Sequence, residues 1–387
     1  MLEDQLAKIG GGGKRTTPLW KGPEEDGVTF SLLSRFLVCR ERFRMYAVEG
    51  WKPADTFNHR IEYGQMWHWC EEAMSKKPRQ DSREWSDGRY ESWVQVLREY
   101  TEELCRKYPL KQKEIFHWGQ VCATQFLLYL RYWSRNDTRD VRETLLSEEV
   151  FSVPYKLPSG RVVKLRGKWD SVFLSGKGKE RGVWLFEHKT KGDIRPQQLQ
   201  RQLTFDLQTM LYLVALGEKQ DSSFWNRSNK MWRSLPIEGV LYNVVRRPLS
   251  GGKGTIVKHK PTKKNPLGES DEEFYARLGE YIKTEPETYF MRWKVEVTEK
   301  DVERFKRECF NPILEQLCWW WEEVTAGPDD TPGQYHDFHS PPPASWRHPF
   351  GVWNILDDGG SSELDEYLAT GSTVGLRQAT DLFPELK

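Results

Sequence analysis

Three charged residues in two neighbouring apolar segments have a spacing that suits metal-dependent chemistry. Asp170 belongs to the segment LRGKWDSVFL, and Glu187 and Lys189 stand two apart near the end of RGVWLFEHKT. Alternate side chains of a β-strand share a face, so Glu187 and Lys189 point together while His188 points away. A hairpin between the two segments would bring the carboxylates of Asp170 and Glu187 side by side.

Two carboxylates held close together repel each other unless a cation lies between them. Hard oxygen ligands in this arrangement suit Mg²⁺ or Mn²⁺. Lys189 could then orient and help deprotonate a water beside the metal, or stabilise the charge that develops on a pentacovalent phosphorus. The plainer alternative is a surface ion pair between Glu187 and Lys189.

Segments with helical periodicity carry further polar residues. His68 lies four residues after Gly64, and Gln208 and Tyr212 stand four apart in the helical pattern over 196–217, so each pair shares one helix face. Either pair alone is common in helices that only pack. Their order around the two carboxylates favours a shared site.

The periodicity of the chain changes at about residue 148. Apolar residues recur at helical spacing over 29–147. Short β-branched and aromatic segments then alternate with the turn sequences PSG and SGKGKERG, which predicts three strands joined as hairpins. A helix over 196–217, a strand over 237–247 and a long helix over 299–324 follow. This order predicts an α/β fold with a mixed sheet, entered through antiparallel hairpins and flanked by helices, rather than a doubly wound parallel sheet.

One elaborated domain accounts for the 387 residues. Within it we expect a flexible leader over 1–28, a helical N-terminal part over 29–147 and a core over 148–326. A C-terminal tail over 327–387 is rich first in proline and aromatic residues and then in acids. The segment 246–266 carries seven Lys or Arg and no acid, which predicts a basic loop or projecting hairpin.

Composition limits the choice of partners and compartment. The formal net charge is +1 although charged residues make up 30% of the chain, so any nucleic acid must be met by a local patch. The six cysteines show no CxxC pair or zinc spacing, and no signal peptide or long apolar run is present. We therefore expect a cytoplasmic protein without a membrane segment.

An ordered set of motifs runs from about residue 29 to residue 247. The motifs are S-LLSRFLVC, Gly64-x-x-x-His68, LRGKWD, WLFEHKT and DLQTMLY. Together they resemble the RecB-type branch of the PD-(D/E)xK nucleases in the restriction-endonuclease-like superfamily. The specificity lies in the order, since no single motif is distinctive. The resemblance implies a restriction-endonuclease-like core.

The resemblance also implies a role for each matching residue. Asp170 and Glu187 would bind Mg²⁺ or Mn²⁺ together with the backbone carbonyl of His188. Lys189 would be the catalytic lysine, and His68 would be an additional metal ligand typical of this branch.

Two helical residues and the cysteines complete the comparison with this branch. Gln208 and Tyr212 would support the site and touch the DNA strand. Some members hold an iron–sulfur cluster through four cysteines, the first at the position of Cys39 and the others near the C-terminus. The C-terminal region here has no cysteine, and Cys309 and Cys318 lie in a helical pattern, so we expect no cluster.

These expectations converge on a metal-dependent DNA nuclease, exonuclease-like, that acts on single strands or linear ends in DNA repair or recombination. Candidate contacts to the DNA backbone are the basic residues Arg246, Arg247, Lys253, Lys258 and Lys260. An alternative is a catalytically silent or partner-dependent DNA-binding subunit of a recombination, replication or defence complex, with the Trp-rich helix ending CWWWEEV as a partner surface. A third reading is an α/β protein whose Glu-x-Lys is only surface decoration.

Overall fold

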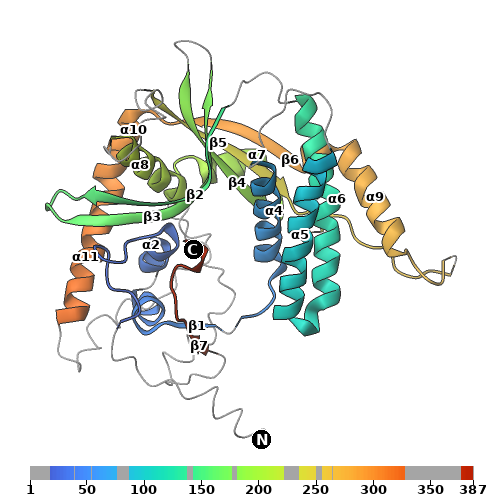
Figure 1. Cartoon of the computed structure of the whole chain (residues 1–387), viewed down its shortest axis with the longest axis horizontal. Helices are drawn as coiled ribbons and strands as arrows, with labels where there is room; N and C mark the ends of the chain where they lie inside the picture. Colours follow the sequence, from blue (N-terminus) through green and yellow to red (C-terminus); the bar gives the residue numbers. More distant parts are fainter. Residues whose placement is uncertain are drawn as a thin grey trace, which may run out of the picture.

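The computed structural model describes residues 18–38, 40–53, 55–75, 87–136, 143–176, 181–221, 235–249, 255–263, 265–326 and 376–386. Its main sheet has five strands in the order β2-β3-β4-β5-β6 (Figure 1). The strands are β2 (Glu143–Lys156), β3 (Val162–Ser175), β4 (Gly182–Lys191), β5 (Ile237–Arg246) and β6 (Phe290–Glu296). Only β4 and β5 pair in parallel. The predicted mixed sheet, entered through hairpins, is confirmed.

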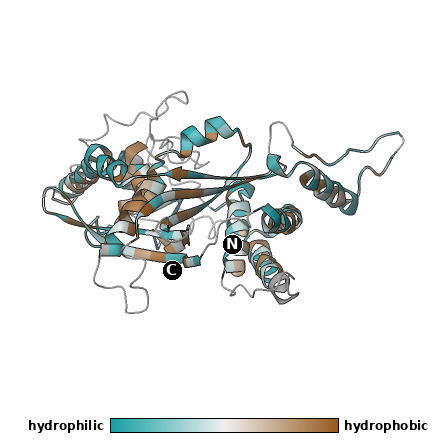
Figure 2. Cartoon of the chain, turned by 90° about the horizontal axis from the view of Figure 1, so that it is seen from above, coloured by the Kyte–Doolittle hydropathy of each residue, from teal (hydrophilic) through white to brown (hydrophobic). Residues whose placement is uncertain are grey.

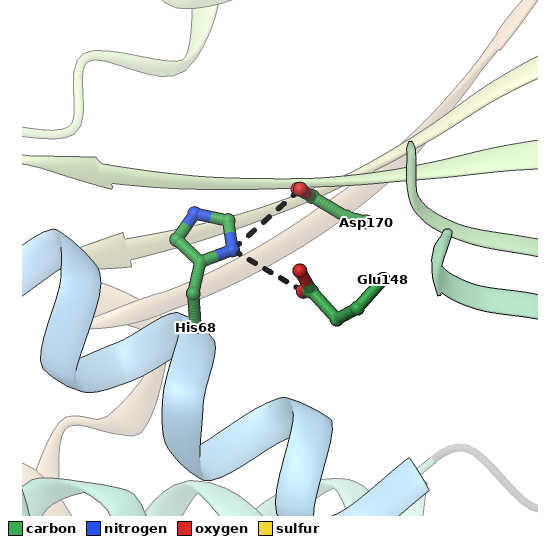
Figure 3. A group of neighbouring side chains, drawn as sticks. All are labelled: His68, Glu148 and Asp170. Carbon is green, nitrogen blue, oxygen red and sulfur yellow. Dashed lines mark ion pairs between the residues drawn. The ribbon is translucent and has the colours of Figure 1, made fainter. Parts of the chain in front are cut away.

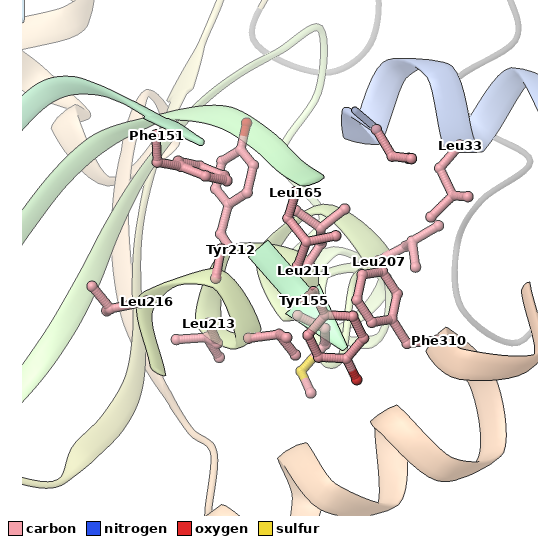
Figure 4. Packing of buried hydrophobic residues seen from close by; sticks show 14 of the residues in the cluster. Leu33, Phe151, Tyr155, Leu165, Leu207, Leu211, Tyr212, Leu213, Leu216 and Phe310 are labelled. Atoms are coloured by element: carbon pink, nitrogen blue, oxygen red, sulfur yellow. The ribbon is translucent and has the colours of Figure 1, made fainter. Parts of the chain in front are cut away.

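Helices cover both faces of this sheet (Figure 1). One face packs against α2 (Phe30–Val38), α8 (Leu207–Asp221) and α11 (Asn311–Ala326), and the other against α4 (His59–Ser75), α5 (Asp87–Lys107), α6 (Gln112–Asn136) and α9 (Asp271–Thr284). Side chains alternate along β5, so this strand contributes to the hydrophobic cores on both faces of the sheet. Tyr242 and Val244 belong to the core beside α8, and Val245 belongs to the core beside α4. Figure 4 shows the first core at the point where Leu165, Leu211 and other side chains of the strands and α8 meet.

The remaining elements are short. They are α3 (Arg40–Phe43), η1 (Arg44–Glu49), β1 (Trp51–Pro53), η2 (Pro109–Lys111), α7 (Pro196–Leu203), η4 (Pro286–Thr288), α10 (Glu299–Phe305), η5 (Lys306–Phe310), β7 (Leu376–Gln378) and η8 (Pro384–Leu386). Figure 2 shows the hydrophobic residues concentrated where strands and helices meet. In the part of the chain that the structure describes, no helix is long and apolar enough to cross a membrane.

The helix predicted over 196–217 is two helices. α7 ends at Leu203 and α8 begins at Leu207, and between them Phe205 has a left-handed backbone with φ of 56°. Asp206 caps the new helix by accepting a hydrogen bond from the amide of Thr209 at 3.4 Å. Periodicity missed the break because apolar residues continue on both sides of it.

Among the longer elements, α9 and β6 were not predicted from the sequence. α9 begins with a reciprocal capping box in which Ser270 accepts from the Glu273 amide at 3.1 Å and Glu273 accepts from the Ser270 amide at 2.9 Å. The strand β6 closes the sheet beside β5. By contrast, the long helix predicted over 299–324 is present as the continuous run α10, η5 and α11.

The described segments near both ends of the chain pack against the rest of the fold. Within the predicted leader, Trp20 is fully buried and donates a hydrogen bond to the carbonyl of Gly27 at 2.9 Å. Within the predicted tail, β7 pairs with β1, and Phe383 is buried under Arg166. For the described residues 18–28, this packing differs from the flexibility expected of the leader, and residues 376–386 also belong to the folded body.

Gly239 provides a test of the β5–β6 packing. Its φ is +142°, and an added Cβ would lie 2.1 Å from the carbonyl oxygen of Val295 on β6. We expect Gly239→Ala to lower the free energy of unfolding by roughly 1–3 kcal/mol. Gly217→Ala is the matched control, because its Cβ would meet nothing within 4 Å and helix α8 gains about 0.5–1 kcal/mol. Urea unfolding followed by circular dichroism measures the free energy of unfolding of both variants. Equal effects of the two substitutions would contradict the close contact between Gly239 and β6.

Candidate metal centre

Two carboxylates face each other across β2 and β3. In the register of these strands, Ser147 pairs with Ser171 and Glu149 pairs with Trp169. Glu148 therefore lies opposite Asp170. Like charges directly opposite each other destabilise a sheet. Glu148 also has a φ of 50°, a conformation that costs a non-glycine residue roughly 1–3 kcal/mol. Packing alone does not account for a residue that is unfavourable in both ways, so this position suggests a role in binding.

His68 of α4 completes a three-residue group with these two acids (Figure 3). Its Nδ1 lies 3.6 Å from Oδ1 of Asp170 and 3.7 Å from Oε1 of Glu148. One ligand atom from each residue can be chosen so that all three lie within 4.8 Å of one another. Ligands at about 2.0–2.6 Å on opposite sides of a hard cation lie about 4–5 Å apart, so the group has the dimensions of a metal site.

Glu187 and Lys189 extend from β4 next to this group. The Lys189 ammonium donates to Oε1 of Glu187 at 2.7 Å and to Oε1 of Gln208 at 2.6 Å. Gln208 in turn donates from Nε2 to the hydroxyl of Tyr212 at 3.3 Å. The break between α7 and α8 orients this part of α8 toward β4, so the strand and the helix hold Lys189 between them.

One oxygen of Glu187 remains available for a ligand. The side chain is 2% exposed, and its Oε2 has no hydrogen-bond partner among the described residues. A buried carboxylate oxygen without a partner costs free energy that a bound cation would recover. The donor set therefore fits a divalent ion beside Glu187 as well as beside Asp170.

The main chain of His188 joins the two strands of the site. Its amide donates to Oδ2 of Asp170 at 2.8 Å, which fixes the carboxylate toward β4. Its ring lies on the opposite face, where Asn243 Nδ2 approaches Nδ1 at 2.8 Å. Asn243 Oδ1 accepts from Nε of Arg292 at 2.9 Å, so its Nδ2 must donate and Nδ1 of His188 must accept. The His188 proton therefore resides on Nε2.

Crowding of charges changes the proton affinities in this site. Burial raises the pKa of Glu187 to about 7; Lys189 opposes the shift and Asp170 adds to it. Burial lowers the pKa of His68, but the carboxylates of Asp170 and Glu148 outweigh it and raise the value to about 9. Burial also raises the pKa of Asp170. The site therefore holds protons near neutral pH that a metal ion would displace.

The predicted DNA contacts occupy different environments. Arg246 and Arg247 are buried, at 1% and 8% exposure. Lys258 is exposed and pairs with Asp271 at 2.6 Å, and Lys260 is exposed. Lys253 lies outside the described residues, as does Cys39. The five remaining cysteines are buried and free: Cys70, Cys105, Cys122, Cys309 and Cys318.

Sequence reasoning missed Glu148. Its signal is the acidic pair Glu148–Glu149 within the strand that forms a hairpin with the strand of Asp170. Alternation directs only one of these acids inward, and Glu149 instead pairs with Lys219 at 2.5 Å. Which acid faces His68 depends on the left-handed backbone at Glu148, which no spacing rule predicts.

A family comparison agrees with this geometry. The family model for the PD-(D/E)XK nuclease superfamily matches residues 28–318, which is well over half of the chain and includes every residue of the site described above. The chain therefore belongs to the PD-(D/E)XK nuclease superfamily. No curated protein matches it.

The affinity for a divalent metal should rise with pH. Glu187, with a pKa of about 7, and His68, with a pKa of about 9, hold protons that a cation must displace, so Mn²⁺ should bind more tightly as pH rises from 6 to 8. The affinity should increase by about tenfold per pH unit for each displaced proton. Calorimetric titration in buffers of different ionisation enthalpy measures the protons released.

Two substitutions in β2 serve as a matched pair in this titration. Glu148→Gln should weaken Mn²⁺ binding, while Glu149→Gln, which alters only an ion pair with Lys219, should leave it unchanged. An equal loss of Mn²⁺ affinity in both variants, or a Mn²⁺ affinity independent of pH, would contradict a metal site formed by His68, Glu148 and Asp170.

Proposed function

We propose that this protein is a metal-dependent DNA nuclease that hydrolyses phosphodiester bonds with Mg²⁺ or Mn²⁺. The observation that carries the proposal is the Lys189 ammonium held 2.7 Å from Glu187, beside Asp170, in a chain of the PD-(D/E)XK nuclease superfamily. Carboxylates that gather cations and a fixed ammonium are the groups that phosphodiester hydrolysis requires.

Five residues would hold the ion. His68, Glu148 and Asp170 form one side, and the carboxylate of Glu187 and the carbonyl of His188 form the other. Four of these five ligands are oxygen, which favours Mg²⁺ or Mn²⁺ over softer metals. The bound ion would supply Lewis-acid polarisation of a phosphoryl oxygen and a water of lowered pKa.

Lys189 would act as a charged, pre-positioned donor. Burial lowers its pKa, but Glu187 and Asp206 outweigh burial and hold the value above its ordinary range. The side chain therefore carries a positive charge at neutral pH and stabilises negative charge that develops on the phosphoryl oxygens. Its bonds to Glu187 and Gln208 keep the ammonium in place, so little reorganisation accompanies the reaction.

The RecB-type branch and an exonuclease-like action on single strands or ends are the finer parts of this proposal. They are supported by the metal-side histidine His68 on α4 and by Gln208 and Tyr212 on α8, which follow the motif order of that branch. Gln208 contacts the catalytic lysine, and Tyr212 holds Gln208. From the resemblance to that branch, we also propose a role in DNA repair or recombination.

Cleavage assays test the proposal directly. The purified protein should degrade labelled DNA with Mg²⁺ or Mn²⁺ and lose all activity in EDTA. Lys189→Ala should reduce kcat by about 10²–10³, the usual effect of removing one charged donor at a reacting centre. Asp170→Ala should abolish cleavage because the metal is lost. Linear, nicked, circular and single-stranded substrates separate end-dependent from internal cutting.

Lys294→Ala is the control for charge removal on the same sheet. Lys294 is an exposed residue of β6 whose ammonium lies 5.0 Å from the ring centre of Trp184, away from the candidate centre. It should retain activity within about threefold, as expected for a surface change. Binding of DNA without metal-dependent cleavage on any substrate would instead favour the partner-dependent or catalytically silent subunit.

A further inference from the structure

Lys191 is a half-buried cation at the end of β4, next to the candidate centre. Alternation places it on the same strand face as Glu187 and Lys189. Lys189 has two hydrogen-bond acceptors within 2.7 Å, whereas no described residue forms an ion pair or hydrogen bond with the Lys191 ammonium. A partly buried ammonium without an acceptor is unfavourable unless a ligand provides one.

The charges around Lys191 are mostly positive. Arg247 is 8% exposed, donates its amide to the Lys191 carbonyl at 2.8 Å and approaches the Thr190 carbonyl with Nη1 at 3.4 Å. Burial lowers the pKa of Lys191, and Lys189 and Arg247 lower it further, with Asp206 as the opposing charge. Asp206 is not in ion-pair contact and instead caps α8 through Thr209. An anion would relieve this repulsion.

Lys191 lies beyond Lys189 on the same face of β4, whereas Thr190 between them points to the opposite face, where a Cβ on Gly64 of α4 would lie 3.3 Å from its hydroxyl oxygen. Lys191 follows Lys189 by two strand residues, about 6.7 Å along β4. That separation is comparable to the distance between neighbouring phosphates in a nucleic-acid strand.

We propose that Lys191 binds the phosphate adjacent to the scissile one on the same nucleic-acid strand. The inference rests on the proposed nuclease function and narrows its substrate class to a strand with consecutive charged phosphates, as opposed to an isolated phosphodiester. Contacts of this kind set affinity and register without reading sequence. Lys191 is thus a binding residue and Lys189 a catalytic one.

Oligonucleotides with one neutral methylphosphonate test this assignment. The neutral linkage is placed at the position on either side of the cleaved bond, and kcat/KM is compared with that of the unmodified strand. For the wild type, one of the two positions should cost about tenfold, the loss of one charge-assisted contact. In Lys191→Ala, the unmodified strand should be cleaved about tenfold less efficiently, mainly through KM, and the same methylphosphonate should then cost nothing further.

Two more variants separate binding from structural effects. Lys191→Arg should restore the sensitivity to the methylphosphonate because it keeps the charge, and Lys294→Ala should behave as wild type throughout. Thermal unfolding of each variant identifies loss of folding. An equal methylphosphonate penalty in wild type and Lys191→Ala, or a loss confined to kcat, would overturn the phosphate contact.

Failure of the nuclease function itself would be visible separately. If the wild type cleaves no unmodified strand, the proposed function is wrong, and fluorescence anisotropy with the same oligonucleotides then decides the contact. A methylphosphonate penalty on binding that disappears in Lys191→Ala would still support it. A penalty that persists would overturn it.

Discussion

Repulsion between the buried carboxylates is the constraint on which the rest of the site depends. The oxygens of Glu148 and Asp170 lie within 4.8 Å, a separation at which two full charges repel by roughly 3 kcal/mol for an effective dielectric of about 20. Lys168 offsets part of this by pairing with Glu148 at 2.6 Å, and His68 by its approach to both acids. Burial raises the pKa of Asp170, and the Glu148 carboxylate adds to the shift. Burial opposes ionisation of Glu148 as well, but His68 and Lys168 outweigh it and lower the pKa of Glu148. A divalent cation bound between the two carboxylates would reduce the remaining repulsion.

Contacts on both faces of β4 hold the carboxylates in position. On one face, Glu187 and Lys189 meet α8. On the other, the His188 ring is fixed by Asn243, whose amide is itself oriented by Arg292 of β6. Between the two faces runs the His188 amide that binds Asp170. Because the ring anchors the peptide, strands β5 and β6 influence a carboxylate that they never touch.

Sequence patterns predicted the sheet order of the hairpins and the motif residues, because both follow from local spacing. Alternation alone placed Glu187 and Lys189 together, and the structure brings them within 2.7 Å. Spacing could not predict Glu148, whose inward direction depends on a left-handed backbone, nor the turn at Phe205 that orients Gln208. Nor could it predict that Trp20, next to glycine-rich sequence, lies in the core, because its ring packs against Phe43 and the distant Trp321.

Lys189 and Lys191 lie on the same face of β4 but differ in their hydrogen-bond partners. Lys189 is fixed by acceptors from a strand and a helix, so its charge has one position, as stabilisation of a transition state requires. Lys191 lacks such acceptors among the described residues. The missing acceptors agree with the phosphate-binding role that we propose for Lys191.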